Sequence, residues 1–239
     1  MKIETPNIIF GRNPVKEALR ANRVSKVYIS NNFSDKDISS LLQEKKPYIK
    51  VISNGELSQK SNGGVHQGVV AEIKPYEYLD LEEILRRSRK ETVPIIVILD
   101  GIEDTHNLGA ILRSCDVFNV TGVLIPKHNQ VPLNATVAKA SAGAINYVPV
   151  AQIGSINQTI QKLKDNGFWV VSTDGNAKID YNQIKFDFPT ALVIGSEGKG
   201  VSPLVVKNSD YVVKIPQYGH VNSLNASVAA GILLAKIRS

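Results

Sequence analysis

Arg113 is the first residue in this sequence whose type and surroundings point to chemistry, and it lies on an expected helix at residues 107–119. The apolar positions of that helix form one stripe that we expect to be buried, made of Leu108, Ile111, Leu112, Cys115 and Phe118. Arg113 lies off this stripe, with Gly109 and Ala110 one turn earlier on its own face. Such small neighbours let a phosphate reach the guanidinium, which can hold it through two parallel hydrogen bonds. An ordinary solvated arginine is the alternative.

A second segment, Gly195–Gly200, holds three glycines in six residues directly after an expected buried strand. Glycines at such a place let backbone N–H and C=O groups approach a ligand closely. Glu197 is the only acid in the loop. A plain surface turn is the alternative, but two glycines would suffice for a turn, so we favour a ligand-binding loop.

A third segment leaves an expected strand at Ile215-Pro216 and leads through a Pro/Gly loop into a helix at residues 225–238. Ser223 and Asn225 can each cap that helix. The small residues that follow Asn225 in this helix allow close packing against a neighbouring element. Capping and tight packing account for the segment whether or not it also has a functional role.

Signatures of several other ligand sites are absent. A phosphate-binding P-loop would need Lys where Val201 stands, and a nucleophile elbow would need Gly where Ile194 stands. No G-x-G-x-x-G follows a strand. Glu103, Asp104 and His106 could gather on a metal, but their spacing matches no metal motif, and we favour polar loop residues. No metal site is expected.

Alternating strand and helix patterns place these segments in an α/β domain. Strands are expected at residues 95–99, 122–125, 147–150, 168–172, 191–194 and 211–215, and helices at 107–119, 135–142, 155–166, 203–208 and 225–238. This order predicts a mostly parallel sheet that is covered on both faces. Because ligands of such sheets bind beyond the carboxyl ends of the strands, all three segments lie where a site is expected.

A smaller α/β domain is expected to come first. Asn13 would cap a helix through residues 15–21, with Pro14 at its first position. The remaining elements are strands at 24–30, 48–53 and 68–73 and a helix at 35–45. We expect residues 1–74 to form this domain, residues 75–93 to be a linker and residues 94–239 to form the second domain.

Composition sets the class of protein. The chain has 239 residues, 43% of them hydrophobic and 21% charged, which excludes disorder as its main state. Its one cysteine excludes a disulfide framework, and it has no apolar run long enough for a membrane span and no export signal. A cytoplasmic protein without membrane contact is expected. The net charge of +6 is compatible with nucleic acid but is common among other enzymes.

In this order, the three segments resemble the SPOUT superfamily of RNA methyltransferases, specifically its TrmH/SpoU-type 2′-O-ribose branch. The family motif N-x-G-x-x-x-R is met at residues 107–113, G-S-E-G-x-G at 195–200, and Ile-Pro followed by Ser-Leu-Asn at 215–216 and 223–225. The similarity covers essentially all of residues 94–239. Gln217 stands where family members often carry Met, and Asn146 where they commonly carry Glu.

The N-terminal residues carry a further resemblance. Residues 10–15 and 66–70 look like the RNA-binding extension of the subgroup that methylates a guanosine of 23S ribosomal RNA, a small ribosomal-protein-like α/β domain. The resemblance therefore implies a large-subunit ribosomal RNA substrate, with a transfer RNA ribose as the alternative. It also implies a deep trefoil knot in the parallel-sheet domain.

The resemblance implies S-adenosylmethionine as the cofactor and assigns roles by motif position. Its cofactor-binding residues are Gly195, Ile215, Leu224, Thr173, Ile194 and Ser223, and its catalytic residues are Arg113, Asn107, Glu197 and Asn225. Arg12 and Arg113 would contact RNA. We interpret Arg113 as a phosphate clamp, since a guanidinium holds its proton too firmly to act as a base.

Two other classes of function are alternatives to an RNA methyltransferase. A non-catalytic RNA-binding module is disfavoured by the intact motif residues, and a small-molecule enzyme on an unknotted fold by the extra basic domain.

The resemblance implies a homodimer with the site at or near the interface. The helix at 225–238 supports this because it is apolar on nearly all sides, Leu233 and Leu234 included. A helix wrapped within its own domain is the alternative.

Overall fold

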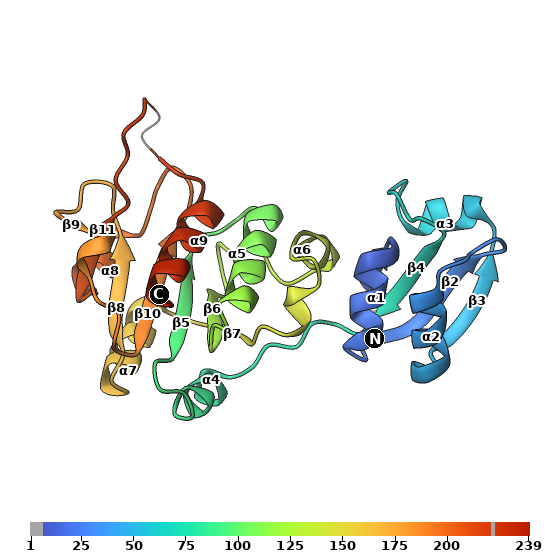
Figure 1. Cartoon of the computed structure of the whole chain (residues 1–239), viewed down its shortest axis with the longest axis horizontal. Coiled ribbons are helices and arrows are strands. Elements are labelled where there is room, and N and C mark those ends of the chain that lie inside the picture. The colour runs from blue at the N-terminus through green and yellow to red at the C-terminus, as the bar shows by residue number, and fades with distance from the viewer. Residues whose placement is uncertain (1–6, 221–222) are drawn as a thin grey trace. The chain divides into compact units, whose positions relative to one another are not determined.

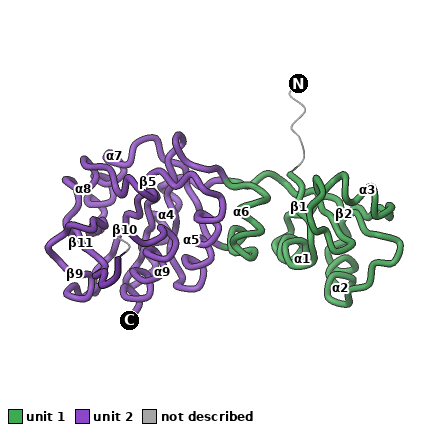
Figure 2. Tube along the Cα trace, turned by 90° about the horizontal axis from the view of Figure 1, so that it is seen from above, with its two compact units in different colours: residues 1–77, 133–147 green, residues 78–132, 148–239 purple. Residues whose placement is uncertain are grey.

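The computed structural model describes residues 7–220 and 223–239. The chain divides into two compact units (Figure 2): residues 1–77 with 133–147, and residues 78–132 with 148–239. Residues 1–6, where no export signal was found, lie outside the described residues. No helix in the described ranges is both long enough and apolar enough to cross a membrane.

The first unit is built on a sheet with the order β1-β4-β2-β3 within the described residues. Its strands are Asn7–Phe10 (β1), Val24–Ser30 (β2), Tyr48–Ile52 (β3) and Val69–Ile73 (β4). Its helices are Arg12–Arg20 (α1), Lys36–Lys45 (α2), Asn54–Lys60 (α3), Ala135–Ala140 (α6) and the 3₁₀ turn Ala144–Asn146 (η1). Leu133–Tyr147 belongs to this unit although it lies far along the chain.

Helix α1 begins two residues earlier than the sequence predicts. Gly11 precedes it with a φ of 91°, and the N–H of Arg12, the first helical residue, donates a 2.9 Å hydrogen bond to Gln67 Oε1. Asn13 is therefore not the N-cap. Pro14 occupies the third helical position, where its missing N–H costs no intrahelical hydrogen bond.

The second unit holds a sheet in the order β7-β6-β5-β10-β8-β11-β9 across its described residues, and every pair in it is parallel (Figure 1). Its strands are Ile95–Asp100 (β5), Gly122–Pro126 (β6), Val150–Ile153 (β7), Trp169–Thr173 (β8), Ile179–Asp180 (β9), Thr190–Gly195 (β10) and Tyr211–Lys214 (β11). Its helices are Leu81–Ser88 (α4), Thr105–Val117 (α5), Ile156–Asp165 (α7), Pro203–Asn208 (α8) and Ala226–Ile237 (α9), with Tyr181–Gln183 (η2) as a 3₁₀ turn. The expected parallel α/β sheet is confirmed, and the trefoil knot stays a prediction.

Helix α4 lies inside the expected linker, yet it contributes to the core of the second unit. Ile84 and Leu85 are 0% and 1% exposed and pack in one cluster with residues of β5, β6 and β7. Gly122 at the start of β6 makes room for Ile84, because a Cβ there would lie 2.7 Å from two of its carbons. The second unit therefore includes α4 as part of its core.

Helix α9 packs against α5 within the second unit. Leu233 and Leu234 are fully buried there, so these two side chains are covered by their own unit. Val228 remains 48% exposed, and Val117 of α5 is 69% exposed. The large apolar side chains that α5 and α9 expose are thus Val117 and Val228 rather than the buried leucines.

Strand β10 positions the functional loops. It lies between β5 and β8, and Gly195 at its end is in register with Asp100 at the end of β5. Because all strands are parallel, the segments after β5, β8, β10 and β11 leave the sheet at one edge. The three sequence motifs meet at this edge.

Candidate active site

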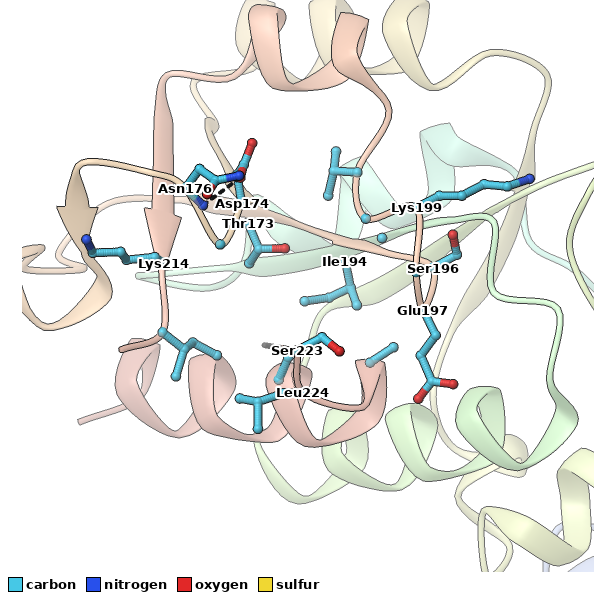
Figure 3. A pocket seen from close by; sticks show the side chains of 18 of the residues that line it. Thr173, Asp174, Asn176, Ile194, Ser196, Glu197, Lys199, Lys214, Ser223 and Leu224 are labelled. Carbon is cyan, nitrogen blue, oxygen red and sulfur yellow. Dashed lines mark hydrogen bonds between the residues drawn. The ribbon is translucent and has the colours of Figure 1, made fainter. Parts of the chain in front are cut away.

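A cavity of about 410 Å³ lies beyond the carboxyl ends of β8, β10 and β11 (Figure 3). Its lining comes from Thr173–Asn176, from 194–201, from Val213, Lys214, Ile215 and Gln217, and from Ser223, Leu224, Ala226 and Ala229 at the start of α9. Segments that are distant in sequence therefore share one hollow, as expected at the edge of a parallel sheet.

All six residues predicted to bind the cofactor line this cavity: Gly195, Ile215, Leu224, Thr173, Ile194 and Ser223. Asp174, Asn176 and Lys214 also line it and were not predicted. Their positions at strand ends could have indicated this role, because Asp174 and Asn176 follow the last residue of β8 and Lys214 ends β11.

Gly195 is a position at which only glycine fits. A Cβ built there would lie 2.1 Å from the carbonyl carbon of Gly200 and 2.2 Å from the backbone nitrogen of Val201. The loop is pulled back onto the strand end by a hydrogen bond of 2.9 Å from the Gly200 N–H to the Ser196 carbonyl. Gly200 reaches this turn with a φ of 66°. The absent side chain therefore lets the loop fold against β10 and form a wall of the cavity.

Three predicted catalytic residues form one hydrogen-bond network. The Nδ2 of Asn225 donates to Asn107 Oδ1 at 2.8 Å and to Glu197 Oε1 at 2.5 Å. Asn107 lies on α5 and is 8% exposed, whereas Glu197 is exposed in the glycine loop. One residue from each motif thus meets beside the cavity.

The cap of α9 sets the orientation of this network. Asn225 Oδ1 accepts hydrogen bonds from the backbone N–H groups of Ser227 at 2.9 Å and Val228 at 3.3 Å. Since its oxygen is held by the helix, its NH₂ group must face Asn107 and Glu197. Asn225 is therefore both the predicted cap and the centre of the network.

The two predicted RNA-binding arginines lie elsewhere. Arg113 is exposed on α5, does not line this cavity, and makes no hydrogen bond or ion pair with a described residue. Arg12, in the first unit, forms an ion pair of 3.6 Å with Asp35, and its guanidinium lies 5.9 Å from the centre of the Phe33 ring. The predicted role of each stays a prediction.

A second cavity of about 210 Å³ adjoins the first. It is lined by Gly101, Ile102, Glu103, Asp104, Asn107, Ser196, Glu197 and Lys199. Ser196, Glu197 and Lys199 line both cavities, so the glycine loop is a wall common to the two. The sequence predicts Glu103 and Asp104 to be plain loop residues, but in the structure both line this second cavity.

Two other chemistries find no support. No cluster of three or more His, Cys, Asp and Glu side chains that could hold a metal occurs among the described residues. Cys115 is fully buried, and burial raises the pKa of its thiol far above the usual range, so it is not a ready nucleophile. The site instead offers backbone, amide and carboxylate groups.

Both parts of the chain match known protein families. Residues 94–235 match the SpoU rRNA Methylase family, and residues 8–79 match the family described as RNA 2′-O ribose methyltransferase substrate binding. A TrmH family tRNA/rRNA methyltransferase of Staphylococcus aureus (strain MSSA476) is 44% identical over 235 residues, which cover 96% of this chain and 94% of that one. Its counterpart in Staphylococcus haemolyticus is 43% identical over the same coverage.

Solved structures show the same fold. The SpoU methyltransferase AviRb of Streptomyces viridochromogenes, with bound AdoMet in one crystal structure, superposes with a TM-score of 0.81 at 23% identity, covering 97% of this chain and 88% of its own. The TrmH/SpoU tRNA modifying enzyme of A. aeolicus is 31% identical, with a TM-score of 0.56 over 66% of this chain and 82% of its own. The first similarity spans both units, and the second a smaller part of the chain.

Proposed function

This chain belongs to the SpoU rRNA Methylase family, and on that premise we propose that it methylates the ribose 2′-hydroxyl of a guanosine in large-subunit ribosomal RNA. The methyl group of S-adenosylmethionine passes from the sulfonium to the 2′-oxygen, and the hydroxyl proton is lost. The products are S-adenosylhomocysteine and a 2′-O-methylated ribose. RNA is required because the acceptor is the 2′-hydroxyl itself.

The observation that carries this proposal is the cavity at the ends of β8, β10 and β11. Its volume of about 410 Å³ is within the range of roughly 300–1,000 Å³ that small-molecule sites occupy. The Gly195 backbone is free of any Cβ at its wall, and Ile194 and Leu224 give it apolar surface. These residues fit S-adenosylmethionine, which supplies an activated methyl group when it is bound.

The chain's own residues then align the acceptor. The Asn107–Asn225–Glu197 network lies beside the cavity and orients the ribose, while Arg113 holds a neighbouring RNA phosphate and stabilises negative charge that develops on the 2′-oxygen. Positioning supplies most of the rate enhancement, because the methyl donor is already activated.

The proposed function includes a homodimer. Arg113 is exposed on α5, and the exposed apolar side chains Val117 and Val228 lie on α5 and on α9, which pack together. A second copy that covers these helices would shield both valines and bring RNA-binding groups to the interface. The active site then lies at or near the contact between two copies.

The first unit supports ribosomal rather than transfer RNA. Its match to a substrate-binding family at residues 8–79 favours a dedicated RNA-binding domain in the first unit, and the second unit, which includes α4, would form the methyltransferase domain. This arrangement favours the 23S rRNA guanosine-2′-O-methyltransferase subgroup and a role in rRNA processing in the cytoplasm. Transfer RNA is the runner-up, since the staphylococcal relatives bear a name that includes both substrates.

The test is a map of 2′-O-methyl groups on ribosomal and transfer RNA from cells with and without this protein. The proposal expects one ribose methylation of 23S rRNA to disappear in the deletion strain and to return when purified protein and S-adenosylmethionine are added to that RNA. A site lost only from transfer RNA would replace the proposed substrate with the runner-up. Unchanged methylation of both RNAs, with no transfer in vitro, would reject the activity.

A further inference from the structure

The second cavity adjoins the cavity that the proposed function assigns to the cofactor. It shares Ser196, Glu197 and Lys199 with the first cavity, so only the glycine loop separates the two. In Figure 3, Lys199 extends away from the first cavity, and Glu197 points toward the start of α9. At about 210 Å³, the second cavity is smaller than sites for drug-sized molecules and suits a single planar ring system.

An amide group of fixed orientation, on the largely buried side chain of Asn107, belongs to the lining of this second cavity. The Oδ1 of Asn225 is held by the N–H groups at the start of α9, so its Nδ2 must face Asn107. Asn107 therefore presents its Oδ1 to Asn225, which leaves its own Nδ2 as the remaining donor. That Nδ2 has no partner within residues 7–220 and 223–239, although Asn107 is only 8% exposed. An oriented and unpartnered donor in a buried side chain indicates a polar ligand.

The charges around the cavity narrow the class of ligand. Three carboxylates line it, those of Glu103, Asp104 and Glu197, against one cation, Lys199. An RNA phosphate would be repelled there, and the carboxylates do not converge on a metal site in the described part of the chain. The lining instead requires a neutral ligand that donates hydrogen bonds to carboxylates and also accepts some.

We propose that this second cavity binds the base of the acceptor nucleotide, and that Glu103 makes it selective for guanine. The inference rests on the proposed function and adds the part of the chain that reads the base. Guanine carries two adjacent donors, N1–H and N2–H₂, which match the two oxygens of a carboxylate, and beside them the O6 acceptor, which matches Lys199. Asn107 Nδ2 is left for a hydroxyl oxygen of the attached ribose.

The hydrogen-bond donors and acceptors of the other three bases do not match these side chains. Adenine has no donor at N1 and bears an amino group where guanine has O6, so it would place an acceptor against a carboxylate and a donor against Lys199. Uracil and cytosine each lack the pair of adjacent donors. Glu103 is the residue to test, because it is exposed and forms no hydrogen bond or ion pair with the described residues, whereas Asp104 also caps α5 through a 2.9 Å hydrogen bond from the His106 N–H.

The first experiment identifies the product without knowledge of the site. RNA from a strain that lacks the protein is methylated in vitro with full-length enzyme, digested to nucleosides and analysed by mass spectrometry. The proposal expects 2′-O-methylguanosine as the single new methylated nucleoside. Another 2′-O-methyl nucleoside as the product would overturn the guanine assignment but leave the methyltransferase function in place. No methylated nucleoside at all would instead reject the proposed function.

The second experiment tests Glu103 directly. Once the acceptor position is mapped, the same RNA is prepared with guanosine or with inosine, which lacks the 2-amino group, at that position. Wild-type enzyme should show a kcat/KM about ten- to a hundredfold lower on inosine, the range expected for lost hydrogen bonds to a charged group and lost base discrimination. Glu103→Gln should lose a similar factor on guanosine and should no longer distinguish the two RNAs.

A matched control separates this role from folding. Asp165→Asn also neutralises one exposed acid of the second unit, but Asp165 lines neither cavity, and it should keep the wild-type preference for guanosine. Cofactor affinity, measured by calorimetry, should be the same in all three proteins. A Glu103→Gln enzyme that still discriminates guanosine from inosine as the wild type does would overturn the proposal.

Discussion

Replacement of Gly195 by alanine tests the link between the glycine loop and cofactor binding. The added Cβ would lie 2.1 Å from the Gly200 carbonyl carbon, whereas ordinary contacts of this kind begin at 3.4 Å. The obstacle is backbone, so the loop itself must withdraw from β10, and it carries Ser196 and Glu197 with it. Overpacking of this kind costs about 1–3 kcal/mol of folding stability. If the bound state needs the original loop position, a comparable loss of binding energy lowers cofactor affinity by about five- to 150-fold.

The assay is isothermal titration calorimetry with S-adenosylmethionine, paired with thermal unfolding of each variant. Gly154→Ala is the matched control, because Gly154 lies directly after the last residue of β7 in the same sheet but has no atom within 4 Å of a built Cβ. Gly154→Ala should bind the cofactor as the wild type does. If Gly195→Ala remains folded and binds with wild-type affinity, the argument from close backbone approach is wrong.

Three further predictions concern other parts of the chain. Arg113→Ala should abolish methyl transfer while calorimetry shows cofactor affinity near that of wild type; unchanged turnover would remove its proposed role as a phosphate clamp. A truncated protein of residues 78–239 should unfold at a clearly higher denaturant concentration than one of residues 94–239, since each buried aliphatic side chain of α4 that is lost costs about 1.5–3 kcal/mol, and equal midpoints would contradict this. The longer of the two should bind cofactor yet lose activity on RNA, measured by methyl transfer. Val228→Glu should yield folded monomers in sedimentation, whereas an unchanged oligomeric state would place the dimer contact elsewhere.

The parallel sheet was predictable because its signal is local. The run of β-branched residues at 95–99 became β5, with side chains from Ile95 to Leu99 fully buried. Most other expected strands recur with small shifts at their ends, but the strand expected at 147–150 is wrong, because β7 begins only at Val150 and runs to Ile153. Parallel strands bring their carboxyl ends to one edge, so the loops after them had to meet. For this reason six residues predicted from two separate motifs and two strand ends line one cavity.

Long-range packing was not predictable in the same way. The helix at 135–142 was expected and appears as α6, but nothing in its own pattern indicates that it belongs to the first unit. There Lys139 lies 5.4 Å from the centre of the Phe10 ring, and a Cβ at Gly143 would lie 2.6 Å from a carbon of Glu17. Hydrophobic periodicity tells which face of a helix is buried, but not which distant element covers it.

Asn225 shows why a single residue type can be required for both the fold and the site. Aspartate would cap α9 as well as asparagine does, but it would place a second carboxylate against Glu197, which lies 2.5 Å from the Asn225 amide nitrogen. Serine can also cap a helix, yet its hydroxyl has one hydrogen to donate, whereas Asn225 donates to both Asn107 and Glu197. Only a side chain with an acceptor on one side and an NH₂ group on the other satisfies the helix N-terminus and the network together. The same geometry leaves the amide nitrogen as the free donor of Asn107, a residue that lines the second cavity, so the cap of α9 sets which Asn107 group is available to the proposed acceptor nucleotide.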